Sequence, residues 1–120
     1  MLRTASGRFA TMAADWIRVG YTQSNFNSDN CLVAGRTIDF GPFGFVERYE
    51  PNWSMWVGSK RGGQYSFMNQ PEAAKRNFGM LVEALRPLLD PAGQAAADAI
   101  VAEHAQASAA AVDNMIANKL

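Results

Sequence analysis

The sequence contains a single cysteine, no excess of either charge and no apolar run long enough to cross a membrane. Cys31 has no partner within the chain, which excludes an internal disulfide and makes a reducing compartment the expected one. Eleven basic residues balance eleven acidic ones, so charge gives no reason to expect a nucleic acid or an anionic membrane as a partner. A membrane-spanning helix needs about 20 consecutive apolar residues, and no stretch approaches that length.

Acidic residues are also scarce at the start of the chain. Residues 1–16 contain arginine but no acidic residue before Asp15. This composition fits a weak organellar transit signal, and it also fits a plain amphipathic helix, which we prefer. We expect a reducing compartment, the cytoplasm if the source is bacterial and the mitochondrion if it is eukaryotic, and we do not expect secretion.

The residues that are present suffice for one small folded domain. The chain has 120 residues, of which 48% are apolar and 18% are charged. Glycine, asparagine and aromatic residues dominate before residue 70, whereas alanine and other helix formers dominate after it. We expect a mostly helical α+β fold.

Helical periodicity predicts the two ends of this fold. Apolar residues at spacings of three and four predict a helix over 7–19, which Gly20 would end. Pro71 fits the first turn of a helical region over 71–120, and Asp90-Pro91 would divide that region into two helices. Because the helical pattern runs up to both ends of the sequence, we expect the chain to be an internal piece of a larger domain.

A loop and a hairpin are predicted within residues 23–45. The polar residues 23–30 predict the loop, and two β-prone runs around Ala34-Gly35-Arg36 predict the hairpin. The two glycines and the proline of 41–45 argue against a regular strand there.

An irregular aromatic segment is predicted over residues 46–70. Its aromatic side chains are expected to pack onto the helices rather than to form a binding surface. They are Trp53, Trp56, Tyr65 and Phe67. Lys60-Arg61-Gly62-Gly63, in the same segment, is typical of a solvated turn.

Two short motifs flank the predicted hairpin. Asp29-Asn30 precedes it, and Asp39-Phe40-Gly41 ends it. A hairpin would bring Asn30 and Asp39 to one edge, and a carboxamide and a carboxylate supply the oxygen ligands that Mg²⁺ prefers. The simpler alternative is that Asn and Asp are turn residues here and that Asp-Phe-Gly is a common tripeptide.

The combination of these motifs with their neighbours resembles the selenoprotein O family. The resemblance is carried by Asn27-Ser28-Asp29-Asn30 and by the run from Thr37 to Phe45. It extends to Trp16 and Val19-Gly20 upstream and to Tyr65 through Pro71 downstream. The similarity therefore extends over nearly the whole chain.

This resemblance implies a fold, an activity and three site residues. The fold would be part of a protein kinase-like catalytic lobe over residues 1–120, with the hairpin carrying metal ligands. The activity would be transfer of AMP from ATP, with Mg²⁺ or Mn²⁺, to Ser, Thr or Tyr hydroxyls of proteins. Asp29 would be the catalytic base, Asn30 and Asp39 would bind the metal, and Asp39 would contact the nucleotide phosphates through that metal.

The sequence departs from the family pattern at Gln23 and Ser24, where the family often has His-Gly. This departure raises a question about the packing of the loop more than about the chemistry. A second departure is that nothing before Asp29 supplies a nucleotide-covering element and a strand lysine. The chain would thus require an N-terminal lobe as its partner, and by itself it would be inactive.

Two other functions are considered. One is a non-catalytic interaction module that keeps the packing of the lobe. The other, an ordinary protein kinase, fits less well, because its catalytic Asp lies several positions before the Asn, whereas Asp29 immediately precedes Asn30. His104 is expected to be a packed core residue and Cys31 a small buried apolar residue.

Overall fold

The computed structural model describes residues 1–38, 41–55 and 63–119. Within this part of the chain, long helices dominate and the strands are short, which confirms the mostly helical α+β prediction. The helices are α1 (Leu2–Val19), α3 (Gln70–Leu85) and α4 (Pro91–Lys119), with short 3₁₀ turns η1 (Ser28–Asn30), η2 (Phe67–Asn69) and η3 (Arg86–Leu88). The strands are β1 (Tyr21–Gln23), β2 (Cys31–Leu32), β3 (Arg36–Thr37) and β4 (Phe43–Phe45).

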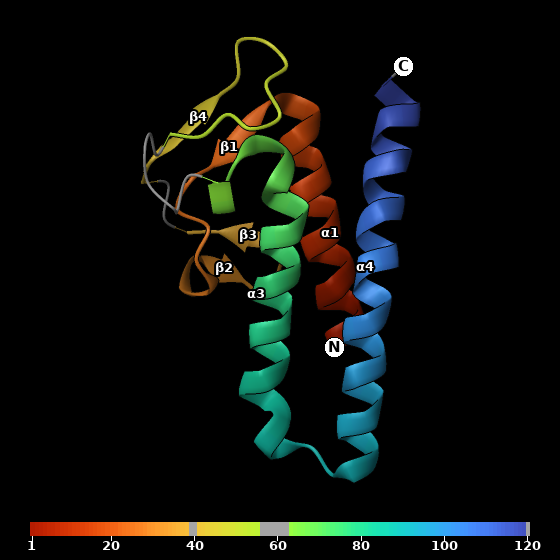
Figure 1. The fold of residues 1–120 in the computed structure, drawn as a ribbon. Helices are drawn as coiled ribbons and strands as arrows, with labels where there is room; N and C mark the ends of the chain where they lie inside the picture. The colour runs from red at the N-terminus through yellow and green to blue at the C-terminus, as the bar shows by residue number, and fades with distance from the viewer. Residues whose placement is uncertain (39–40, 56–62, 120) are drawn as a thin grey trace.

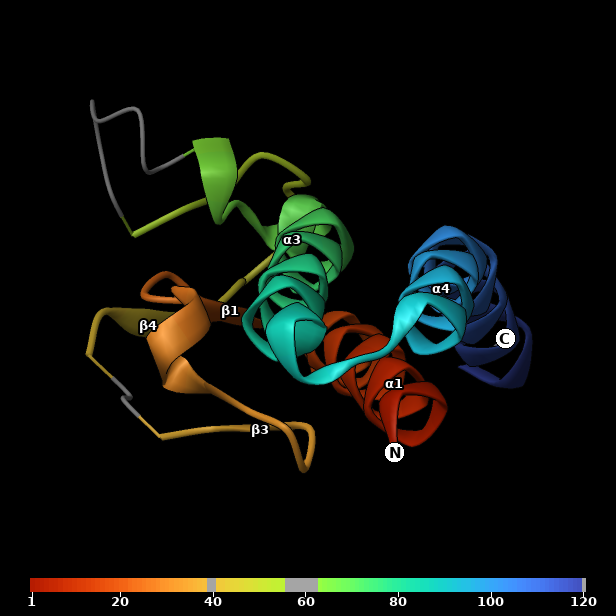
Figure 2. The same cartoon turned by 90° about the horizontal axis from the view of Figure 1, so that it is seen from below.

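The three long helices form one body, and the strands cover one side of it. Seen along the helices, α4 lies on the side of α1 and α3 that faces away from the strands (Figure 2). Helices α3 and α4 run in opposite directions and are joined by a short connection at one end (Figure 1). The strands pair as two separate antiparallel ribbons, β1 with β4 and β2 with β3.

Helix α1 begins at Leu2, earlier than the predicted start at residue 7. Its first turns bury Ala5 and Ser6, so the buried stripe continues toward the N-terminus beyond Phe9. The helix ends where predicted. Gly20 adopts φ 76°, and its N–H donates to the carbonyl of Ile17 at 3.2 Å. This left-handed conformation is the one that glycine adopts without strain.

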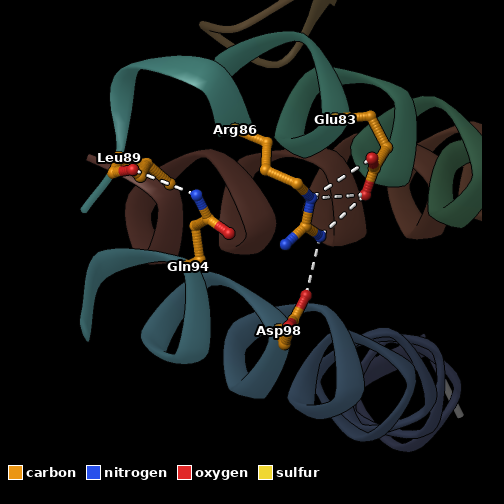
Figure 3. A network of polar contacts seen from close by, with 5 residues as sticks. All are labelled: Glu83, Arg86, Leu89, Gln94 and Asp98. Atoms are coloured by element: carbon orange, nitrogen blue, oxygen red, sulfur yellow. Dashed lines mark hydrogen bonds and ion pairs between the residues drawn. The ribbon is translucent and has the colours of Figure 1, made fainter. Parts of the chain in front are cut away.

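The predicted signals for α3 and α4 are also confirmed. Pro71 lies in the first turn of α3. Asp90 caps α4, since its Oδ1 accepts the N–H of Gly93 at 2.6 Å. Figure 3 shows the connection between the helices, where Arg86 donates to Glu83 and to Asp98 at 2.7 Å each.

The core lies where the three helices meet. Phe9 and Phe78 pack edge to face with ring centroids 6.0 Å apart, and Phe78 stacks on His104 at 5.0 Å. His104 is fully buried, and its Nδ1 shares a hydrogen bond of 2.7 Å with Ser6 Oγ. The prediction of a packed core histidine is confirmed. Among the helices of the described residues, none combines the length and apolarity of a membrane span.

The prediction that 41–45 forms no regular strand was wrong. Phe43–Phe45 pairs with Tyr21–Gln23, with Gly44 opposite Thr22. A Cβ at position 44 would meet the ring of Trp53 at 2.8 Å, so here glycine allows a close aromatic contact instead of breaking the strand. The same pairing places Gln23, expected in a loop, at the end of β1.

Where the aromatic segment is described, its predicted side chains pack inward, but Trp53 packs against strand β4 and not against a helix. Tyr65 and Phe67 are buried, and Trp53 is half-buried against Gly44. Trp56 and Lys60 through Gly62 lie outside the described residues.

Candidate functional site

The candidate site is built on the turn η1 and the hairpin that follows it. In η1, Asp29 is exposed to solvent, whereas the next residue, Asn30, is buried with 9% of its surface exposed. A 3₁₀ turn has three residues per turn, so neighbouring side chains differ by about 120° in direction. The turn therefore presents one side chain to solvent and the next to the protein interior.

Asn30 connects the loop to the hairpin. Its Nδ2 donates to the carbonyl of Asn25 at 2.8 Å, and its own carbonyl accepts the N–H of Ile38 at 3.3 Å. The bond to Asn25 holds the carboxamide by its nitrogen. The carboxamide oxygen, Oδ1, is then the atom that can bind a cation.

The predicted hairpin is confirmed. Cys31 lies opposite Thr37 and Leu32 opposite Arg36. Gly35 turns the chain with φ 76°, and its N–H donates to the carbonyl of Leu32 at 2.9 Å. Added carbon at this position would meet Arg8 Cβ at 2.7 Å, so the turn rests directly on α1.

The hairpin brings the chain back to Asn30, as the sequence predicted, through the bond from Ile38. The next residues, Asp39 and Phe40, lie outside the described residues. The metal-binding and nucleotide-contacting roles of Asp39 therefore stay predictions.

Side chains from other elements hold the loop that leads into η1. Asn77 on α3 donates through Nδ2 to the carbonyl of Phe26 at 3.1 Å. The hydroxyl of Tyr65 donates to Asn27 Oδ1 at 2.7 Å. Phe26 is itself fully buried and packs against Trp16. The loop before Asp29 is thus fixed from α1, from α3 and from the aromatic segment.

The sequence did not predict a buried polar network that forms around Gln23, at the start of this loop. The backbone N–H of Gln23 donates to Gln70 Oε1 at 2.9 Å, and Gln23 Nε2 donates to Thr37 Oγ1 at 3.0 Å. Gln23 Oε1 accepts the hydroxyl of Tyr21 at 2.9 Å. Gln23 and Gln70 are fully buried. Gln23, which stands where the family often has His, is therefore part of the packing that supports this loop.

A groove of about 340 Å³ runs beside Asp29. Its walls include Cys31, Asn77, Met80 and Leu81. Burial raises the pKa of the Cys31 thiol to about 12, although a hydrogen bond with Asn77 acts in the opposite direction. The thiol is protonated at neutral pH, so Cys31 behaves as a half-buried apolar residue rather than a nucleophile.

The donor chemistry of the site fits a hard divalent cation. The oxygens of a carboxamide at Asn30 and of a carboxylate at Asp39 are ligands of the kind that Mg²⁺ and Mn²⁺ prefer. Within residues 1–38, 41–55 and 63–119, no three His, Cys, Asp or Glu side chains gather as a metal cluster. Asn30 is the one predicted ligand that the structure describes.

Comparison with known proteins decides the family. A family model described as protein adenylyltransferase SelO matches residues 2–120. The chain belongs to this family. The resemblance inferred from the motifs between Trp16 and Pro71 is thereby confirmed.

The SelO-family relatives are much longer than this chain. A protein named protein nucleotidyltransferase YdiU from Xanthomonas campestris pv. campestris is 42% identical over 85 residues, which are 71% of this chain and 16% of the relative. Proteins of the same name from Xanthomonas euvesicatoria pv. vesicatoria and Xanthomonas oryzae pv. oryzae are 43% and 42% identical over 81 residues. Those 81 residues are 68% of this chain and 16% of either relative.

Proposed function

We propose that this chain is the metal-binding part of a kinase-like catalytic lobe in a protein adenylyltransferase. The enzyme would transfer AMP from ATP to a Ser, Thr or Tyr hydroxyl of a protein and release pyrophosphate. The observation that carries the proposal is the hydrogen bond from Ile38 to Asn30, since it returns the hairpin to the turn that bears Asp29 and Asn30. Membership of the SelO family supports the reaction type.

In this proposal, Asp29 accepts the proton of the incoming hydroxyl. The hydroxyl oxygen forms a bond to the α-phosphorus of ATP, the bond from that phosphorus to the bridging oxygen breaks, and pyrophosphate leaves. A general base must be accessible to its substrate, and Asp29 is exposed beside a groove. Its position on a turn held from three sides would keep the carboxylate in place during the reaction.

Asn30 and Asp39 would hold Mg²⁺ or Mn²⁺, which neutralises phosphate charge when it is bound. The hydrogen bond from Asn30 Nδ2 to Asn25 fixes which end of the carboxamide is offered. Asp39 would also contact the nucleotide phosphates through the same ion. The hairpin would then set the distance between these two ligands.

The nucleotide would be clamped by a second lobe supplied by sequence outside these 120 residues. The relatives are long enough to contain such a lobe, because the matching segment is 16% of their length. We therefore expect the chain alone to transfer no AMP and to bind ATP more weakly than micromolar. Micromolar binding of ATP to the isolated chain in calorimetry would contradict this expectation.

The test is AMP transfer by a chimera of the Xanthomonas campestris relative, in which this chain replaces the matching segment. Labelled ATP and a mixture of proteins serve as substrates, and Asp29→Asn and Asp39→Ala are compared with the unsubstituted chimera. We expect each change to lower the rate by about 100-fold or more, the scale of general-base catalysis or of a lost metal ligand.

The matched control is Asp98→Asn. Asp98 is an exposed carboxylate on α4 that pairs with Arg86 of η3, so the change removes the same charge from the helix that lies on the side of α1 and α3 away from the strands. It should leave the rate within about twofold, since an exposed ion pair contributes little. Full labelling by the Asp39→Ala chimera would show that the metal assignment is wrong.

A further inference from the structure

Asn77 is a polar residue in the buried stripe of α3. The apolar residues of the same stripe are Ala73, Ala74, Phe78 and Val82. Asparagine is a poor helix former, and a buried amide is costly unless its polar atoms are paired. Asn77 is 7% exposed, so its side chain needs partners inside the protein. The identity of those partners shows what the side chain holds.

Two partners of Asn77 stand on either side of the turn that bears Asp29. Nδ2 donates to the carbonyl of Phe26 at 3.1 Å, two residues before η1 begins. The side chain also forms a hydrogen bond with the thiol of Cys31, the first residue after η1. Segment 26–31 thus starts and ends at one side chain on α3.

Asp29 depends on this segment for its position. Its side chain is exposed, so packing around it does little to fix the carboxylate. The turn has three residues, and the N–H of Asn30 closes it by donating to the carbonyl of Asn27 at 3.0 Å. Tyr65 adds a bond in the middle of the segment, at Asn27, whereas Asn77 holds both ends. Fixing the ends of a short segment restricts the conformations between them.

We propose that Asn77 is a positioning residue: it holds both ends of the turn and thereby sets where the carboxylate of Asp29 lies. This inference rests on the proposed function for the role of Asp29 as the base. It concerns the base and not the metal ligands. The structural part, that Asn77 stabilises the turn, is testable without activity.

The first test measures amide hydrogen exchange in the 120-residue chain. Asn77→Leu keeps the size of the side chain and removes its hydrogen bonds, and leucine is the better helix former. We expect the amide of Asn30, which closes the turn, to exchange about threefold to tenfold faster, the scale of one lost hydrogen bond.

The matched control is Gln94→Met, which also keeps the size of a carboxamide side chain and removes its bond to a backbone carbonyl. Nε2 of Gln94 donates to the carbonyl of Leu89 at the connection between α3 and α4 (Figure 3). This control should leave the exchange of the Asn30 amide unchanged, because the bond that it removes lies in another part of the chain.

The second test measures kcat for AMP transfer by the chimera. Asn77→Leu should lower kcat about tenfold to hundredfold, the cost of a displaced catalytic group, and Gln94→Met should leave it within about twofold. A merely structural loss would lower the rate by the same factor whether or not the base is present. Asn77→Leu is therefore combined with Asp29→Asn. Once the base is gone its position no longer matters, so the double variant should stay within about threefold of Asp29→Asn alone.

The outcomes separate this inference from the proposed function. A larger further loss in the double variant, or full labelling by the Asn77→Leu chimera, would overturn the positioning role and leave the proposed function standing. An unsubstituted chimera that labels nothing would count against the proposed function, and the exchange of Asn30 would then decide the structural claim. Unchanged exchange of Asn30 in Asn77→Leu would overturn that claim. If leucine prevents folding, Asn77→Ala, which adds no bulk, takes its place in both tests.

Discussion

Gln70 is the residue whose loss should weaken the fold most for its size. It is fully buried at the start of α3. Its Oε1 accepts the N–H of Gln23, and its Nε2 donates to the carbonyls of Tyr21 and Phe67 at 2.9 and 3.0 Å. One side chain thus satisfies three backbone groups from two segments that are far apart in the sequence.

Gln70→Ala would leave these three groups without their partner. A buried polar group that loses its hydrogen bond costs about 1–3 kcal/mol, which sums to roughly 3–9 kcal/mol for the three groups if water reaches none of them. Alanine returns about 0.4 kcal/mol through its higher helix propensity. We expect the free energy of unfolding to fall by about 3–9 kcal/mol, a large share of the roughly 6–18 kcal/mol typical of a chain this long.

Urea unfolding followed by far-ultraviolet circular dichroism measures this loss. The control is Gln94→Ala, which removes the same side chain from a half-buried site where Nε2 donates to one carbonyl, that of Leu89 (Figure 3). The control should cost about 0.5–1.5 kcal/mol, the typical value of one hydrogen bond. If Gln70→Ala cost no more than this control, the reasoning from the buried network would be refuted.

Three further predictions concern other parts of the structure. Burial lowers the pKa of His104, and Lys75 lowers it further, whereas Glu72 raises it. The free energy of unfolding should therefore fall as the pH drops below about 6.5, the pKa of histidine in the unfolded chain. His104→Gln should make the urea midpoint depend less on pH between pH 7.5 and 5. Gly35→Ala should cost about 1–3 kcal/mol in urea unfolding, because φ is 76° and the added carbon meets Arg8. Arg86→Ala should cost about 1 kcal/mol in the same assay, since the two carboxylates that it pairs with are largely exposed, while the Arg86 side chain itself is 28% exposed.

The elements that the sequence predicted correctly are those specified by neighbouring residues. Gly20 and Gly35 adopt the left-handed backbone that glycine favours, Pro71 lies in a first helical turn, and Asp90 caps the helix that follows it. Each signal acts within a few residues, so it can be read without knowledge of the fold. The hairpin between Asn30 and Ile38 is local in the same sense.

The β1–β4 ribbon and the Gln23 network could not be predicted in this way. Gly44 is usually a poor strand residue, and its suitability here depends on the ring of Trp53. Gln23 and Gln70 lie 47 positions apart, and nothing in a polar residue reveals that it will be buried with a distant partner. Both features depend on tertiary contacts, which local patterns do not contain.

The turn η1 shows why the order of the two candidate site residues matters. Because adjacent residues of a 3₁₀ turn point in different directions, Asp29 reaches solvent while Asn30 is held inside by Asn25 and accepts the N–H of Ile38. A carboxylate at the inner position would bring its charge next to the carbonyl of Asn25 and lose the bond that Nδ2 donates there. A neutral carboxamide at the outer position could not accept a proton from a hydroxyl. The backbone of one short turn thus places Asn30, the proposed neutral ligand, in the interior and Asp29, the proposed base, at the surface, as the proposed chemistry requires.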